Sequence, residues 1–128
     1  GMYVEIDHWL RPFALAEALH GHAMEVFASL PAEVRDDLMT DPAFVMCDFE
    51  PGRVFAVPMR LSMPRRPGRS VVLKRTLRQR PQAFIRWVIA HELAHAHLRN
   101  GGRWPGDDPE HAADALAGDW GFPRPVKW

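Results

Sequence analysis

The segment from Trp87 to Leu98, WVIAHELAHAHL, places histidines and one glutamate in an otherwise apolar run. His91 and His95 are four residues apart, so on a helix their imidazoles project from one face and can hold one metal ion. Glu92 lies about 100° around the helix from His91, where it can act on a water molecule without binding the metal. We therefore predict a hydrolytic site in which His91 and His95 bind Zn²⁺ and Glu92 is the general base.

The alternative interpretation of this segment is a buried helix whose histidines find ordinary hydrogen-bond partners. Two imidazoles and a carboxylate are costly to bury in so apolar a helix unless a partner compensates them, and a metal ion supplies that partner. The third histidine, His97, is two residues from His95 and points about 200° away on a helix, which predicts a structural or supporting role for it.

The third metal ligand is expected in the last helix, within DPEHAADALAGDWGFP at residues 108–123. Glu110 and Asp114 are four residues apart and share a helix face. Glu110 would complete a two-histidine, one-glutamate zinc site, and Asp114 would accept a hydrogen bond from the free N–H of a ligand imidazole. His111 is the rival third ligand and lies on a different side of the helix. The other interpretation is an acidic first turn that the helix dipole favours.

Periodicity predicts the elements that come before this site. Apolar residues at helical spacing indicate a helix over 11–30, whose His20 and His22 we expect to face solvent, and Pro31 opens a short helix over 31–39. Extended runs follow, and Pro58 makes the middle run an edge strand or a bulge because proline has no N–H to donate. The three extended runs are 43–49, 52–62 and 69–77.

The two helices that would carry the site are bounded by proline, glycine and aspartate. The helix over 81–99 begins at Pro81, is apolar almost all round and so runs through the interior, and Asn100–Gly102 stops it. Asp108 caps the last helix, with Pro109 at its first position, and that helix runs to about Gly118.

Composition limits the class of protein. A chain of 128 residues with 47% hydrophobic content predicts one domain over 1–128. Sixteen basic and sixteen acidic residues cancel, which argues against a nucleic-acid or membrane-surface binder. Cys47 is the one cysteine, so no intramolecular disulfide forms and a reducing cytoplasm fits. No apolar run has transmembrane length, the N-terminal residues do not read as a signal peptide, and Gly1 is interpreted as a remnant of tag removal.

The HELAH motif and the last helix together resemble the ImmA/IrrE-type metallopeptidases and minimal zincin-like (gluzincin) domains. The resemblance covers roughly residues 70–123, and LRQRPQAFIRWVIAHELAHAHL resembles the segment that leads into that family's active-site helix. This chain departs from the family in having WGFP where many members have Leu-Leu-Met-Pro, and in showing no helix-turn-helix or sensor segment. In the last helix the matching residues are Glu110, Ala113, Asp114, Leu116 and Ala117, followed by Pro123.

The resemblance implies an α+β, zincin-like fold with N-terminal helices, a sheet of about three strands, the HExxH helix and a C-terminal ligand helix. It also implies a zinc metallopeptidase that hydrolyses peptide or protein substrates by metal-activated water. Substrate is expected along the edge strand at 54–61, and His97, His111 and Arg103 are candidates to stabilise the oxyanion. One alternative is a metal-binding interaction module of zincin fold with little or no protease activity, and another is a metal-free helical interaction domain.

Overall fold

The computed structural model describes residues 1–52, 69–99 and 108–126, and this part of the chain forms an α+β fold. Short 3-10 turns lie at Arg11–Phe13 and Arg75–Gln79. Among these residues no helix is both long and apolar enough to cross a membrane. The remaining elements are α1 (Met2–Leu10), α2 (Glu17–Ser29), α3 (Ala32–Met39), β1 (Val45–Phe49), β2 (Ser70–Lys74), α5 (Gln82–Leu98) and α6 (Pro109–Asp119).

The two strands pair in parallel, in a register that runs from Val45 opposite Ser70 to Phe49 opposite Lys74. β1 is buried along its middle, whereas β2 alternates between buried and exposed positions, so that one of its faces meets the core. The strand expected over 52–62 lies outside the described residues apart from Gly52, which is in a turn. Within the described ranges the sheet therefore has two strands, whereas about three were expected.

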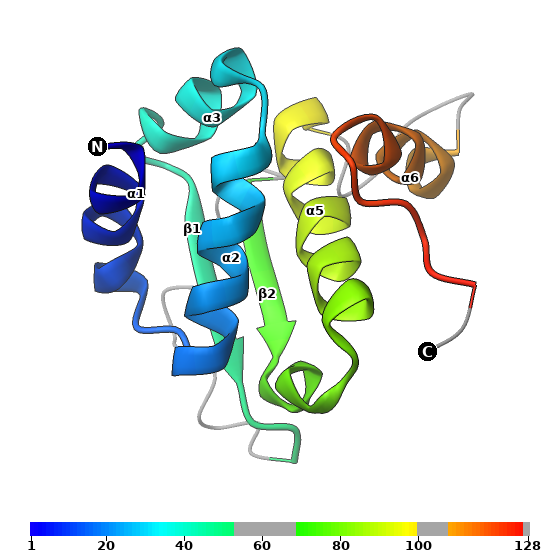
Figure 1. Ribbon diagram of the computed structural model, residues 1–128, viewed down its shortest axis with the longest axis horizontal. Helices are drawn as coiled ribbons and strands as arrows, with labels where there is room; N and C mark the ends of the chain where they lie inside the picture. The colour runs from blue at the N-terminus through cyan, green and yellow to red at the C-terminus, as the bar shows by residue number, and fades with distance from the viewer. Residues whose placement is uncertain (53–68, 100–107, 127–128) are drawn as a thin grey trace.

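The helices pack in an order that places α5 at the centre of the fold. Figure 1 shows α2 and α5 side by side over the sheet, with α6 on the far side of α5 from α2. Ile85, Ile89 and Leu93 of α5 are at most 2% exposed and follow one another at helical spacing. The prediction of an interior helix over 81–99 is confirmed, since α5 spans all but the two end residues of that range.

The N-terminal region differs from the prediction of one helix over 11–30. The chain forms α1 first, which the sequence pattern did not indicate, and then breaks at Ala14 in a left-handed conformation with φ of 55°. α2 begins only at Glu17, with Ala16 at its N-cap position. The buried carboxylate of Asp48 accepts the Ala16 N–H at 2.6 Å, and we infer that this bond sets where the helix starts. The structural reason for the break is therefore a partner 32 residues away in the chain.

His20 is also placed differently from the expectation that it faces solvent. Its side chain is buried, and its Nε2 lies 2.7 Å from the Oδ1 of Asp7. This contact joins α2 to α1. His22 is partly buried and its Nδ1 accepts a hydrogen bond from Arg86 of α5 at 3.1 Å.

A buried arginine at the start of β2 links three elements near the C-terminal end of α5. Arg69 is 2% exposed and donates to both carboxylate oxygens of Asp37 in α3, at 2.8 and 3.2 Å, and to the Ala96 carbonyl at 3.2 Å. Its Nε lies 3.1 Å from the Oδ2 of Asp41. The hydrogen bonds from Arg69 hold the pKa of Asp37 below its ordinary value although partial burial opposes this. The stabilisation is therefore present at neutral pH and is lost as the pH falls through the lowered pKa.

Replacing Asp37 by Ala should lower the free energy of unfolding by about 3 kcal/mol, because the buried guanidinium of Arg69 loses its main counter-charge. Denaturant unfolding at pH 7 measures the change. The matched control is Asp36→Ala, at an exposed neighbour on the same helix, which should change stability by less than about 0.5 kcal/mol. Equal changes in the free energy of unfolding for the two substitutions would show that the ion pair between Asp37 and Arg69 does not stabilise the fold.

Candidate metal centre

The two histidines of HELAH face each other on the buried side of α5. His91 and His95 are each 7% exposed, one helical turn apart. Their Nε2 atoms are 3.2 Å apart and their rings are nearly perpendicular, at 86°. An apolar helix thus presents two ring nitrogens to a single point.

Glu110 of α6 meets both histidines. One carboxylate oxygen lies 2.8 Å from the Nε2 of His91, and the other lies 3.1 Å from the Nε2 of His95. The local sequence sets this position: Asp108 caps α6 by accepting the backbone N–H of Glu110 at 3.0 Å, and Pro109 occupies the first turn. The expected cap is confirmed, and it places the Glu110 carboxylate opposite α5.

Asp114, one turn further along α6, fixes the other side of the His91 ring. Its Oδ1 lies 2.8 Å from the Nδ1 of His91 and also accepts the indole N–H of Trp87 at 2.9 Å. Its Oδ2 is 3.4 Å from the Nε of Arg124. With Nδ1 donating to a carboxylate, the Nε2 lone pair of a neutral His91 is directed toward Glu110 and His95.

Trp87 and Arg124 were not predicted as parts of the site. Trp87 is four residues before His91, so helical periodicity places the two side chains on the same face of α5. This spacing could have identified Trp87 as a neighbour of the site from the sequence. Arg124 follows the end of α6 in an irregular segment, where no periodic pattern exists. Its guanidinium lies 4.7 Å from the centre of the Trp87 ring, so the two side chains close this side of the site together.

The separations among the donor atoms of His91, His95 and Glu110 are close to those around a tetrahedral zinc ion, with a different Glu110 oxygen nearest each imidazole. Zn–N bonds of about 2.0–2.1 Å at tetrahedral angles separate the ligand atoms by about 3.3–3.4 Å. The Nε2–Nε2 distance is 3.2 Å, and the two distances to Glu110 are 2.8 and 3.1 Å. Among the described residues, His91, His95 and Glu110 form the group whose ligand atoms converge in this way.

Hydrogen bonds alone do not account well for the close approach of the His91 and His95 Nε2 atoms and the Glu110 carboxylate. If both Nε2 atoms donated to Glu110, their N–H groups would lie against each other at an Nε2–Nε2 distance of 3.2 Å. His91 would in addition carry a full positive charge, since its Nδ1 already donates to Asp114. A cation between the three groups removes both problems, because all three then act as electron-pair donors. The residues present therefore fit Zn²⁺.

The two carboxylates of α6 are held as anions. Burial raises the pKa of Glu110, but the hydrogen bond from His91 and the nearby His95 outweigh it and the net pKa is lowered. Burial likewise raises the pKa of Asp114, and hydrogen bonds from Trp87 and His91 bring it below its ordinary value. An anionic Glu110 is the form that binds a divalent metal.

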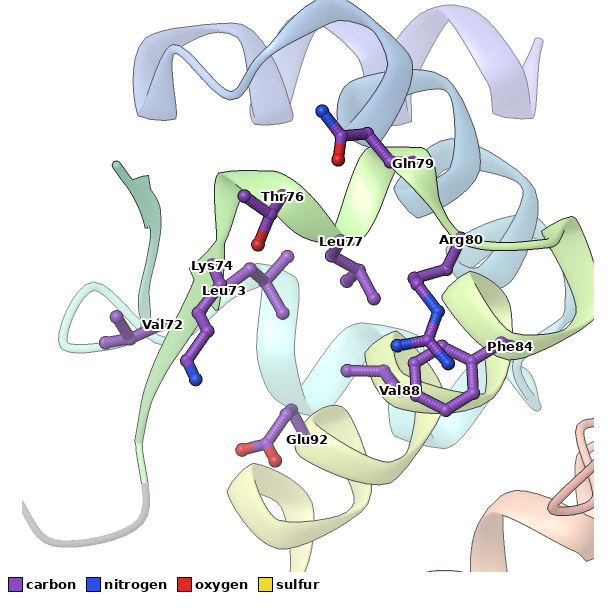
Figure 2. Close-up of a pocket in the computed structure, with 10 residues that line it drawn as sticks. All are labelled: Val72, Leu73, Lys74, Thr76, Leu77, Gln79, Arg80, Phe84, Val88 and Glu92. Atoms are coloured by element: carbon purple, nitrogen blue, oxygen red, sulfur yellow. The ribbon is translucent and has the colours of Figure 1, made fainter. Parts of the chain in front are cut away.

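Glu92 lies on a different face of α5 from the metal ligands. It lines a pocket of about 470 Å³ between α5, β2 and the turn that follows β2 (Figure 2). Burial raises its pKa, and the charges of His95 and His91 oppose the shift. A carboxylate with a raised pKa, adjacent in sequence to a candidate metal ligand, is better suited to accept and return a proton than one with an ordinary pKa.

The remaining histidines of the two helices do not enter the centre. The Nδ1 of His97 lies 2.8 Å from the Oδ2 of Asp37, so this side chain points to α3, and a structural or supporting role stays a prediction. His111 is exposed and is not in the converging group. Arg103, another candidate to stabilise an oxyanion, lies outside the described residues.

Comparisons of the chain with protein-family models, with curated proteins and with solved structures found no match. The resemblance to the ImmA/IrrE-type metallopeptidases therefore stays a prediction from the motif residues. The assignment of the metal centre rests on the side-chain geometry of this chain.

The protein should bind about one Zn²⁺ per chain, and Glu110→Ala should weaken that binding while His111→Ala leaves it unchanged. The physical reason is that Glu110 lies within 3.1 Å of both imidazoles. Titration with a zinc-sensitive indicator and elemental analysis measure affinity and stoichiometry. A wild-type protein that takes up no zinc at micromolar concentrations, or a loss of zinc in His111→Ala instead, would overturn the ligand assignment.

Removing the metal should destabilise the protein and loosen α6 first, because the ligands come from two helices. Metal that binds only the folded state stabilises it by about 4 kcal/mol at a free concentration a thousand times the Kd, which corresponds to roughly 15 °C in Tm. Thermal unfolding with and without EDTA and hydrogen exchange on α6 are the measurements. Glu92→Gln should keep the metal-dependent shift. An unchanged melting curve after confirmed zinc removal would mean that packing alone holds α6 on α5.

Proposed function

We propose that this protein is a zinc-dependent peptidase. The observation that carries the proposal is the convergence of the His91, His95 and Glu110 ligand atoms at separations of 2.8 to 3.2 Å, next to a glutamate that lines an open pocket. A structural metal site gains nothing from such a neighbouring carboxylate. A hydrolytic site requires it as a base.

Bound Zn²⁺ would supply Lewis-acid polarisation of the scissile carbonyl and a lowered pKa for the attacking water. Side chains of the protein would bind the metal, orient its ligands and transfer the proton. His91, His95 and Glu110 hold the metal, and Asp114 keeps the His91 ring in one orientation. Glu92 accepts the proton of the attacking water and passes it to the leaving amine, for which a raised pKa is favourable.

The fold proposed for this activity is zincin-like. Three observations support it: a central helix that carries HELAH, a following helix that brings Glu110 to it, and strand β2 beside the pocket of Glu92. The edge strand at 54–61, where substrate was expected, lies outside the described residues. In the described part, Val72 and Lys74 of β2 are exposed and line the same pocket as Glu92, so a substrate in this pocket would run beside β2.

Zinc-loaded wild-type protein should cleave members of a mixed peptide library, and Glu92→Gln should lower kcat at least a hundredfold because the amide cannot accept a proton. Mass spectrometry of the products measures cleavage, and elemental analysis confirms that the variant keeps its zinc. His111→Ala serves as the control, since His111 is exposed and outside the ligand group. If no peptide is cleaved by zinc-loaded wild type, the protein is a metal-binding module and the peptidase proposal fails.

A further inference from the structure

The segment that forms most of the Glu92 pocket carries positive charge only, and Glu92 is the one acidic side chain that lines the pocket. The chain from 69 to 91 contains no aspartate or glutamate and six basic residues. Three of these have partners in the structure: Arg69 pairs with acids of α3 and the loop after it, Arg75 with Asp48, and Arg86 with His22. The other three form no ion pair with any residue of the described ranges, and they are Lys74, Arg78 and Arg80.

Two of these unpaired cations line the pocket. Lys74 extends from the end of β2 toward the end of the pocket where Glu92 lies, and Arg80 lies over the ring of Phe84 at the other end (Figure 2). The guanidinium of Arg80 is 4.4 Å from the ring centre, which holds it on the pocket wall. The apolar side chains of Leu77 and Val88 lie between Lys74 and the stacked Arg80 and Phe84 (Figure 2). The pocket therefore combines an apolar wall with one cation toward each end, and Glu92 lies at the Lys74 end.

The length of the pocket matches a short extended peptide. Phe84 precedes Glu92 by eight residues on α5, which is about 12 Å along the helix axis. An extended chain rises about 3.3 Å per residue, so about three to four residues cover this distance. A peptide held at Glu92 would place one of its side chains against the apolar wall. Carboxylates on the flanking residues of the peptide would then lie within reach of Lys74 and Arg80.

We propose that Lys74 and Arg80 determine specificity, and that the pocket selects acidic peptides in which an apolar side chain is flanked by carboxylates. The inference rests on the proposed peptidase function for the position of the scissile bond. A polyanion such as single-stranded nucleic acid fits the pocket less well. The wall offers one aromatic ring, Phe84, whereas proteins that bind single strands generally stack successive bases on several rings.

The test uses two fluorescein-labelled eight-residue peptides with a central leucine, flanked by glutamates in one and by glutamines in the other. Binding is measured by fluorescence anisotropy with zinc-loaded Glu92→Gln protein, which leaves the peptides intact. The acidic peptide should bind about tenfold more tightly at low salt, and the preference should shrink as salt screens the charges.

Lys74→Gln and Arg80→Gln, each added to this protein, should reduce the preference about threefold. Arg78→Gln is the matched control, because Arg78 is an exposed cation of the same basic run that does not line the pocket. Unchanged melting curves establish that the variants fold. Equal binding of the two peptides, binding of neither, an equal loss in Arg78→Gln, or tighter binding of a single-stranded oligonucleotide would each overturn the proposal.

Cleavage of the same two peptides by zinc-loaded wild-type protein separates this inference from the proposed function. Selective binding without cleavage of any peptide would contradict the peptidase proposal and leave the acidic-peptide pocket standing. Cleavage of both peptides at the same kcat/KM would support the peptidase and overturn the role of Lys74 and Arg80.

Discussion

The burial of His91 and His95 in α5 is the constraint on which the rest of the structure depends. A ring nitrogen removed from water needs a partner, and α5 offers none because its own backbone groups are bonded within the helix. α6 supplies the partners, since Glu110 meets both Nε2 atoms and Asp114 meets the Nδ1 of His91. Asp108 starts α6 at the position that makes this possible. The polar contacts thus set the register of α6 on α5 and form the ligand group at the same time.

The period of α5 separates the residues proposed for metal binding from the residue proposed for proton transfer. Consecutive residues of a helix point about 100° apart, so His91 can face α6 while Glu92 faces the pocket beside β2. α6 packs on this face of α5, so that the two imidazoles are buried while the side chain of Glu110 stays largely exposed. The face of Glu92 stays open toward β2, whose Lys74 is exposed at the same pocket. One helix between a second helix and a strand therefore carries the proposed metal ligands on one face and the proposed general base on another.

The fold was predictable where elements are set by local pattern and was not where a distant partner intervenes. The α+β class, the interior helix and the helix after Pro31 follow from periodicity and proline placement, and they are confirmed. The single helix over 11–30 was wrong because Asp48 accepts the Ala16 N–H and starts α2 late. His20 was expected in solvent, but Asp7 on α1 provides it with a buried partner. Neither partner is adjacent in sequence, and α1 itself was not recognised.

For the candidate site, the sequence by itself determined which side chains share a helix face. His91 with His95, and Glu110 with Asp114, are set by a period of about 3.6 residues, which is a local property of the backbone. Only the tertiary structure decided that Glu110 is the residue that reaches both imidazoles and that the HELAH helix meets α6 at all. These contacts join residues 15 to 23 apart in the chain, across a connection whose path the helical period does not specify. The physical reason is that spacing orients side chains about one axis, whereas the distance between two axes is set by the packing of the whole core.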